Sequence, residues 1–225
     1  MSKIVLFGDA KYADECYFYF TNDSEHDVVG FTVDAAYQTK KELFGLPVVP
    51  FEEVSEKFPP GKFDMFIALG YQDLNRLRKR KYDEAKAKGY KLVSYVSSRA
   101  ANVGKVPIGD NCLILENNSI QPCSKIGDNV TLWSNNIVGH HSTIGDHCYI
   151  AGGVVVSGTT TIGDYSFLGV HATIGQGISI GERNVIGAGC VITKSTEPGS
   201  VYIQPDSPKF RLDSEHFMKI TKIER

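Results

Sequence analysis

The sequence predicts an α/β N-terminal domain with a small parallel sheet, a Rossmann-like half, followed by a parallel β-helix of hexapeptide repeats. Strand-like and helix-like segments alternate over the first 97 residues, which is typical of a parallel α/β sheet. From Ile108 to Ile192 every sixth residue is Ile, Leu or Val, without an insertion. These patterns divide the 225 residues into an α/β domain at 1–97, a β-helix at 98–203 and a tail at 204–225.

A longer period of eighteen residues lies on top of the period of six. Ile-Gly followed by an acidic residue recurs at Ile108, Ile126, Ile144, Ile162 and Ile180. Three hexapeptides per turn predict a triangular coil, in which each side is a short strand and each corner is a turn. The aliphatic residues should point inward and stack on their counterparts one coil away, at the parallel-strand spacing of about 4.8 Å.

The first 97 residues supply the strands and helices of the α/β domain. Strands are expected at Lys3–Phe7, Asp27–Asp34, Pro47–Pro50, Phe63–Leu69 and Lys91–Val96. Helices are expected at Asp9–Phe20 and Gln72–Lys88. Gly89 is suited to end the second helix as its C-cap.

Composition argues against several classes of protein. The net charge of −2 gives no indication of nucleic acid or of an acidic membrane as a partner. The basic run Arg76–Lys81 is interrupted by Leu77 and followed by Asp83 and Glu84, which indicates a solvated helix face. No apolar run approaches the roughly 18 residues of a membrane span, and the N-terminal apolar stretch is too short for a secretory signal. We therefore expect a cytoplasmic protein without membrane insertion.

The cysteines indicate packing rather than chemistry. The five cysteines form no CxxC pair, and no export signal is expected, so a disulfide framework is not expected. Cys112, Cys148 and Cys190 occupy one repeat position and should fill the interior as small apolar residues. A solenoid this short exposes its ends and flat sides, so we expect it to form oligomers.

The α/β domain has one candidate ligand site. Ligands of such sheets bind beyond the carboxyl ends of the strands, near the first strand–helix turn. That turn is Gly8-Asp9-Ala10-Lys11, and Asp34 ends the second strand, where it could accept hydrogen bonds from a ribose or a base. The glycine-rich dinucleotide motif is absent, so a plain turn with an exposed Asp34 is an equally good interpretation.

Four features together resemble one family: the initial strand–helix unit, the stretch Phe66–Gly70, the join Ser94–Ser98 and the hexapeptide solenoid. The chain resembles the hexapeptide-repeat sugar acetyltransferases, which include bacillosamine and perosamine N-acetyltransferases and sialic acid O-acetyltransferases. The resemblance spans residues 3 to about 205. It implies a homotrimer of left-handed β-helices with acetyl-CoA between adjacent subunits, and no metal.

The resemblance also implies the site residues. The family places its catalytic histidine shortly before an Ile-Gly-acidic coil start, and Gly139–Asp146 matches with His140 in that place. His141 is implied as its helper. The residues implied to bind acetyl-CoA are Tyr149, Gly158, Gly169, Val170 and Gly187. The residues implied to bind the acceptor are Gly8, Asp9, Lys11, Asp34, Trp133 and Asn135.

The chemistry of acetyl transfer suits these residue types. Transfer from a thioester needs a base for the proton of the nucleophile and hydrogen-bond donors for the oxyanion, and an imidazole can serve as the base near neutral pH. Gly158 falls one coil above His140 at the same corner, where we expect it to leave room for the pantetheine arm and to offer its N–H to the oxyanion. Some relatives carry an acidic residue at the place of His141 and a second histidine at the place of Tyr149.

We therefore expect an acetyl-CoA-dependent N-acetyltransferase that acts on a nucleotide-linked 4-amino-4,6-dideoxy sugar, for lipopolysaccharide or capsule synthesis. O-acetylation of a sialic-acid-like hydroxyl is the first alternative, and a non-catalytic scaffold is the second. A zinc enzyme with three histidine ligands on the same fold is disfavoured, because the spacing of His140, His141, His147 and His171 does not match such a site.

Overall fold

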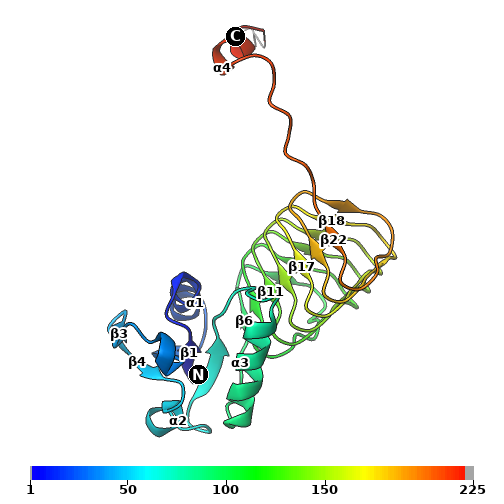
Figure 1. The fold of residues 1–225 in the computed structure, drawn as a ribbon. Helices are drawn as coiled ribbons and strands as arrows, with labels where there is room; N and C mark the ends of the chain where they lie inside the picture. The colour runs from blue at the N-terminus through cyan, green and yellow to red at the C-terminus, as the bar shows by residue number, and fades with distance from the viewer. Residues whose placement is uncertain (1, 221–225) are drawn as a thin grey trace.

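The computed structural model describes residues 2–220. An α/β sheet lies beside the first coils of a long parallel β-helix, and the chain leaves the last coil as an extended tail that ends in α4 (Ser214–Ile220) (Figure 1). Among the described residues no helix is long and apolar enough to cross a membrane. The predicted fold class is confirmed.

The N-terminal sheet is mixed rather than purely parallel. Its order is β3-β4-β2-β1-β5, and only the β3–β4 pair at the edge is antiparallel. The strands are β1 (Lys3–Phe7), β2 (Asp27–Val33), β3 (Glu42–Leu43), β4 (Leu46–Pro50) and β5 (Asp64–Ile67). The predicted parallel core is therefore extended by one short hairpin, whose tip lies at Phe44 and Gly45 with positive φ angles.

The helices are shorter than or displaced from the predicted ranges. They are α1 (Lys11–Asn22), α2 (Val54–Lys57) and α3 (Arg76–Ala87), with a single 3₁₀ turn at Ala35–Tyr37. The predicted helix at Gln72–Lys88 begins four residues late because Asp73, Leu74 and Asn75 have positive φ angles of 50°, 48° and 66°. The side chain of Asn75 donates to the carbonyl of Tyr165 at 3.1 Å, so a tertiary contact holds this turn.

Three parallel sheets form the sides of the β-helix. The covered face consists of β6 (Tyr95–Val96), β8 (Leu113–Ile114), β11 (Thr131–Leu132), β14 (Tyr149–Ile150), β17 (Phe167–Leu168), β20 (Val185–Ile186) and β22 (Val201–Tyr202). The polar face consists of β10 (Lys125–Ile126), β13 (Thr143–Ile144), β16 (Thr161–Ile162) and β19 (Ser179–Ile180). The apolar face consists of β7 (Ala101–Asn102), β9 (Ser119–Ile120), β12 (Ile137–Val138), β15 (Val155–Val156), β18 (Thr173–Ile174) and β21 (Val191–Ile192).

The two sequence periods set the geometry of the coils. Residues eighteen apart pair in register, as in Ile126 with Ile144, and the aliphatic residues of the six-residue period are buried in one continuous core. Cys112, Cys148 and Cys190 belong to the same core, as predicted from their repeat position. Asn or His at the corners adopts positive φ, as at Asn129 with 55°, which suits residues that tolerate the left-handed region.

One predicted strand is divided between the two parts of the chain. Lys91–Val96 was expected to be the last strand of the α/β sheet. Only Leu92 forms a bridge with that sheet, to Met65, whereas Tyr95–Val96 pairs with β8 in the β-helix. The first coil therefore begins inside the segment predicted for the α/β domain.

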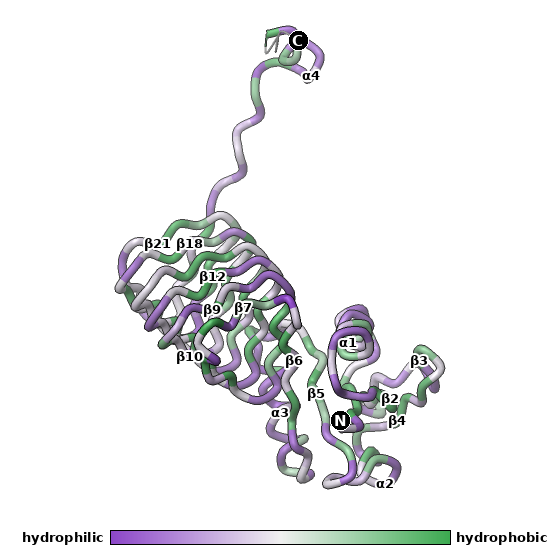
Figure 2. The backbone as a smooth tube through the Cα atoms, turned by 180° about the vertical axis from the view of Figure 1, so that it is seen from behind, coloured by the Kyte–Doolittle hydropathy of each residue, from purple (hydrophilic) through white to green (hydrophobic). Residues whose placement is uncertain are grey.

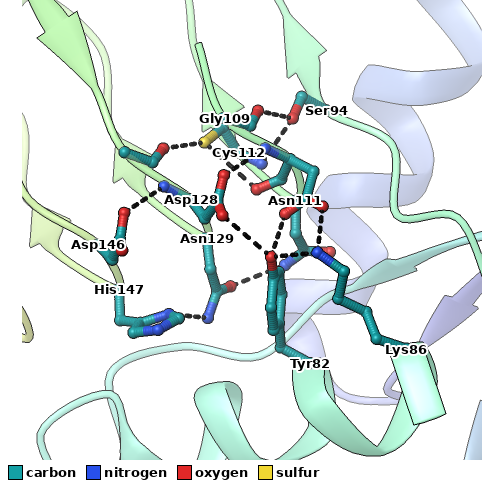
Figure 3. Close-up of polar contacts among 12 residues, drawn as sticks. Tyr82, Lys86, Ser94, Gly109, Asn111, Cys112, Asp128, Asn129, Asp146 and His147 are labelled. Carbon is teal, nitrogen blue, oxygen red and sulfur yellow. Dashed lines mark hydrogen bonds and ion pairs between the residues drawn. The ribbon is translucent and has the colours of Figure 1, made fainter.

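Polar contacts at one corner, which we call the junction corner, join the α/β domain to the β-helix (Figure 3). The backbone N–H of Ile67 donates to Asn111 at 2.7 Å, and Tyr82 of α3 donates to Asp110. The prediction of a solvated basic face is wrong at Arg78, which is 2% exposed and whose guanidinium donates to the side chain of Asn129 and to four backbone carbonyls. On the adjoining covered face, leucines of the first coils share one apolar core with β1 and α1.

The three faces differ in what their outward residues offer. The α/β domain covers the first coils of the covered face, and the outward residues of the polar face are Lys, Thr and Ser. The outward column of the apolar face contains no charge; it consists of Ala101, Ser119, Ile137, Val155, Thr173 and Val191. Figure 2 shows this face with hydrophobic segments along its strands.

Candidate active site

His140 lies at the corner between the apolar and polar faces, which we call the histidine corner. Its backbone N–H donates to the side-chain oxygen of Gln121 at 3.0 Å, and its carbonyl accepts from the N–H of Thr159 at 2.8 Å. Both contacts tie the residue to the coils on either side, while its side chain is exposed. The backbone of this histidine is therefore fixed and its imidazole faces the surface.

The imidazole of His140 rests directly on Gly158. A Cβ atom on Gly158 would lie 2.7 Å from both Cε1 and Nε2 of the ring, which is closer than real Cβ atoms approach other atoms. In this rotamer the ring of His140 fills the space that is expected to admit the pantetheine arm, and the role of Gly158 remains a prediction. The N–H of Gly158 has no acceptor within residues 2–220.

His141 contacts the imidazole of His140 through a ring nitrogen. The two Nδ1 atoms are 3.1 Å apart, so one must donate a proton and the other must accept it. If His140 is the donor, its Nε2 keeps a free lone pair, which is the tautomer that a general base requires. His141 has a φ of 57°, and the turn thereby directs its side chain toward its neighbour.

The other two histidines of the β-helix lie elsewhere. His147 is buried at the junction corner, where its Nδ1 contacts the amide nitrogen of Asn129 at 3.1 Å, and burial lowers its pKa below the usual value. His171 packs on Gly153 at the corner between the covered and apolar faces, which we call the glycine corner. No group of three or more His, Cys, Asp or Glu among the described residues could hold a metal ion.

The glycine corner carries most of the residues expected to bind acetyl-CoA. Gly169 and Val170 lie there on one coil and Gly187 lies on the next, and Asn135 lies two coils below His171. A hollow of about 680 Å³ opens at this corner between Val170–His171, Gly187–Gly189 and Ile203–Ser207. These predicted residues share one edge of the β-helix, and their role remains a prediction.

The turn after β1 is held by its backbone. The N–H of Gly8 donates to the carbonyl of Thr32 at 2.8 Å, and Gly8 has a φ of 129° with the carbonyl of Ala68 only 2.8 Å from the position of a Cβ atom. Only glycine suits both constraints. Lys11 begins α1 and is exposed, and its contact with the acceptor remains a prediction.

A second lysine at this turn was missed by the sequence analysis. Lys40 donates from Nζ to the carbonyl of Asp9 at 2.9 Å, although it lies thirty-one residues away along the chain. No local motif marks it, because it reaches the turn from the segment between β2 and β3. Lys11 and Lys40 together place two cations beside the carboxyl end of β1.

Asp34 is engaged by a buried lysine. Nζ of Lys81 donates to Asp34 at 2.7 Å and to Glu84 at 2.6 Å. Burial lowers the pKa of Lys81, but the hydrogen bonds to these two carboxylates raise it overall above its usual value. Asp34 is thus fixed in orientation rather than free at the strand end, and its second oxygen is the one that could meet a ligand.

Trp133 and Tyr149 lie on the covered face, away from the histidine corner. The indole N–H of Trp133 donates to the phenol oxygen of Tyr149, and burial raises the pKa of Tyr149 to about 12. Tyr149 is a neutral phenol at any physiological pH. As a neutral phenol it can donate a hydrogen bond, but it is not a base at neutral pH.

The structure thus separates the predicted site residues into groups. Lys11 and Asp34 lie at the α/β sheet, Trp133 and Tyr149 lie on the covered face, and Val170 marks the glycine corner. These groups adjoin one another. The histidine corner lies across the full width of the apolar face from them, so one chain alone does not bring His140 to the residues predicted to bind the acceptor.

The repeats match a known family model. Residues 108–140, 124–158 and 159–194 match the model for bacterial transferase hexapeptide (six repeats). A comparison with curated proteins gave no significant match.

Solved structures share the fold of most of the chain. Perosamine N-acetyltransferase from Caulobacter crescentus has a TM-score of 0.77 and 22% identity, with 89% of this chain and 93% of that chain covered. The acetyltransferase domain of PglB from Neisseria gonorrhoeae has a TM-score of 0.76 and 23% identity, covering 88% and 94%. WeeI from Acinetobacter baumannii has a TM-score of 0.76 and 23% identity, covering 89% and 96%. The chain therefore carries hexapeptide repeats of the bacterial transferase type and has the two-part fold of these acetyltransferases.

Proposed function

We propose that this protein is an acetyl-CoA-dependent N-acetyltransferase that acts on the amino group of a nucleotide-linked 4-amino-4,6-dideoxy sugar. The similar perosamine N-acetyltransferase binds CoA and GDP-perosamine, and the PglB domain binds acetyl-CoA. The observation that carries the proposal is the His140 ring, exposed at a corner, seated on Gly158 and hydrogen-bonded through Nδ1. The acetylated sugar would serve the synthesis of a surface glycan.

His140 acts as the general base in this proposal. The amine of the sugar attacks the thioester carbonyl, a C–N bond forms, and Nε2 of His140 takes the proton that the amine loses. The N–H of Gly158, which has no acceptor within residues 2–220, donates to the oxyanion beside the ring of His140. The C–S bond then breaks, and the proton on Nε2 passes to the departing thiolate of CoA.

His141 is proposed as the residue that orients His140. It accepts the Nδ1 proton of His140, which keeps the lone pair on Nε2. A neutral imidazole is a weaker acceptor than the carboxylate that some relatives carry there. The His140–His141 pair therefore holds the tautomer without adding a negative charge to the site.

The two parts of the chain have separate tasks in the proposal. Residues 1–97 hold the nucleotide, with Lys11 and Lys40 beside the diphosphate and Asp34 toward the ribose or base. Residues 98–203 carry the transfer site, and 204–225 form a tail without an assigned role. Gly8 has no side chain, so the diphosphate can approach the backbone of the turn closely. The carbonyl of Asp9 accepts a hydrogen bond from Lys40 and so holds that lysine at the turn.

A homotrimer completes the site. The apolar face is uncharged and uncovered, with Ile137 40% and Val191 60% exposed, which suits burial in a permanent interface. Threefold packing through these faces brings the histidine corner of one subunit against the glycine corner of the next. His140 then faces the neighbour's acceptor residues, Trp133 and Asn135 among them.

The same seam would hold acetyl-CoA. Gly158 lines it from one subunit, while Gly169, Val170 and Gly187 line it from the next. The hollow at the glycine corner lies along this path. Tyr149 borders the seam from the covered face, where its neutral phenol can contact the acetyl end.

The proposal is tested with a panel of acceptors and acetyl-CoA, following release of the CoA thiol. The panel contains GDP-, UDP- and dTDP-linked 4-amino-4,6-dideoxy sugars and free sialic acid. We expect acetylation of at least one nucleotide-linked amino sugar, and a loss of about 100- to 10,000-fold in the His140→Ala variant. Turnover of sialic acid alone would favour O-acetylation, and full activity of His140→Ala would overturn the assigned base.

A further inference from the structure

Five aromatic side chains form one connected group where the α/β domain meets the covered face. They come from three parts of the chain: Tyr12 from the first turn of α1, Tyr71 from the loop after β5, and Trp133, Tyr149 and Phe167 from successive coils. We call this group the aromatic platform.

The rings of the platform contact one another in sequence. Tyr149 and Phe167 are stacked, with centroids 5.8 Å apart and an interplanar angle of 13°. Tyr71 lies against both, at 5.0 Å from Tyr149 and 4.8 Å from Phe167. Trp133 connects Tyr149, at 6.5 Å, with Tyr12, at 6.3 Å. The separations are those of mutually stabilising aromatic pairs.

Polar contacts beneath the rings fix their positions. Trp133 donates its indole N–H to Tyr149, and the hydroxyl of Tyr12 lies 3.1 Å from the hydroxyl of Thr131. The guanidinium of Arg78 lies 5.8 Å from the centre of the Tyr149 ring. Because Arg78 is buried and already donates to five oxygens, it is not available to bind an anion. The platform therefore offers a rigid, uncharged surface.

Tyr71 is the exposed edge of the platform. Its side chain is 54% exposed, although it is a large aromatic residue packed against two others. The carbonyl of Gly70 before it accepts from Arg78 at 3.0 Å, so the loop is anchored at this point. The fold thus holds an aromatic face open to solvent at a fixed place.

The position of the platform indicates what it meets. Tyr12 follows Lys11 in the turn where the diphosphate is proposed to bind, and Trp133 leads into the glycine corner, where the neighbour's His140 is proposed to lie. A sugar attached to that diphosphate must cross the platform on its way to the base. This argument rests on the proposed function.

We propose that the aromatic platform binds the deoxygenated edge of the acceptor sugar, and that Tyr71 makes the enzyme prefer a 6-deoxy sugar over its 6-hydroxy counterpart. Contact between a C6 methyl group and an aromatic face removes apolar surface from water and so favours binding. A C6 hydroxyl group at the same place loses its hydrogen bonds to water and finds only ring carbon, which is unfavourable. One such contact typically changes the ratio of kcat/KM between two such acceptors by about 10- to 200-fold.

Binding can be followed without turnover, because Trp133 is the only tryptophan in the chain. The probes are the nucleotide-linked 4-amino-4,6-dideoxy sugar that the enzyme acetylates and the matching nucleoside diphosphate without its sugar. We expect the sugar-linked probe to change the emission of Trp133 and the nucleoside diphosphate to change it far less, with binding of both confirmed by calorimetry.

Specificity is tested with Tyr71→Ala and with Phe18→Ala as the matched control. Phe18 is 53% exposed and packs on Tyr17 and Phe44 of the same domain, away from the platform. We expect Tyr71→Ala to raise KM for the 6-deoxy acceptor about 10-fold and to reduce the preference over the 6-hydroxy acceptor to a few-fold. KM for acetyl-CoA and kcat should stay unchanged, and Tyr71→Phe should restore the preference.

The outcomes separate this inference from the proposed function. If the wild-type protein acetylates a nucleotide-linked amino sugar but Tyr71→Ala keeps its KM and its 6-deoxy preference, the platform does not bind the sugar. Equal responses of Trp133 to the sugar-linked probe and to the nucleoside diphosphate would likewise show that the sugar does not reach the platform. If no nucleotide-linked amino sugar is acetylated, the proposed function fails and this inference fails with it.

Discussion

The contact between His140 and Gly158 is the feature of single residues on which the chemistry depends. Glycine at 158 lets the imidazole lie flat against the next coil, and Nδ1 of His141 fixes the ring from the side. Sequence matching predicted the histidine and the glycine but assigned the space between them to the pantetheine arm. The packing of a ring on a backbone one coil away is a three-dimensional contact that a repeat pattern does not reveal.

Gly158→Ala tests this contact. The Cβ added at Gly158 would displace the ring of His140 from its position, so we expect kcat to fall by about 10- to 100-fold. Because His140 is an exposed side chain, its ring can move away from the new methyl group, and we expect little loss of stability. Gly104→Ala is the matched control, since Gly104 occupies the same corner position two coils below His140 and its Cβ would meet only Pro122. Equal activity of the two variants in the transfer assay would show that the position of the imidazole is not critical.

At the scale of elements, the repeat made the β-helix predictable and tertiary contacts made the rest less so. Each hexapeptide strand follows from a local period, and every strand of the three faces within Ile108–Ile192 lies where that period places it. The loop before α3 does not follow from local pattern, because Asn75 is held by the carbonyl of Tyr165, ninety residues away. Lys40 was missed for the same reason, since its partner is the distant turn at Asp9.

Arg78 is expected to contribute strongly to the stability of the junction between α3 and the β-helix. Arg78→Met removes the guanidinium that donates hydrogen bonds to four backbone carbonyls and to the side chain of Asn129, and it leaves these buried oxygens without a donor. We therefore expect the free energy of unfolding to fall by about 2–4 kcal/mol. Arg80→Met is the control, because its ion pair with Glu84 is exposed and should be worth less than about 0.5 kcal/mol. Urea unfolding of both variants measures the difference, and similar values would contradict the role of Arg78 in joining the two parts.

His147 makes the same junction sensitive to acid. Burial lowers its pKa in the folded protein, so the unfolded chain binds the extra proton more readily, and stability should be lost as the pH falls below about 6.5. His147→Asn replaces it with the residue found at the equivalent corners 111 and 129, which also have positive φ. We expect a flatter dependence of the urea midpoint on pH between about 7.5 and 5 in this variant. An unchanged dependence would assign the acid sensitivity to other groups.

At the scale of the whole molecule, the distribution of surfaces supports the proposal that the site forms between two chains. The α/β domain occupies the covered face, the polar face suits solvent, and the apolar face lies between the two corners that carry the transfer residues. In the proposed trimer, the predicted groups of site residues meet where a second subunit places its histidine corner beside the first subunit's glycine corner. The sequence could predict the members of each group, but not that one face of the β-helix would separate them.

Mixing two inactive variants tests this central claim most directly. His140→Ala lacks the base, and Lys11→Glu repels the acceptor's diphosphate, so each homotrimer should be inactive at an acceptor concentration well below KM. Co-expressed in equal amounts, they should recover about a quarter of wild-type activity, because one seam in four then combines an intact His140 with a neighbour's intact Lys11. Mixed trimers without any recovery would contradict the account, since His140 and the acceptor residues would then have to work within the same chain.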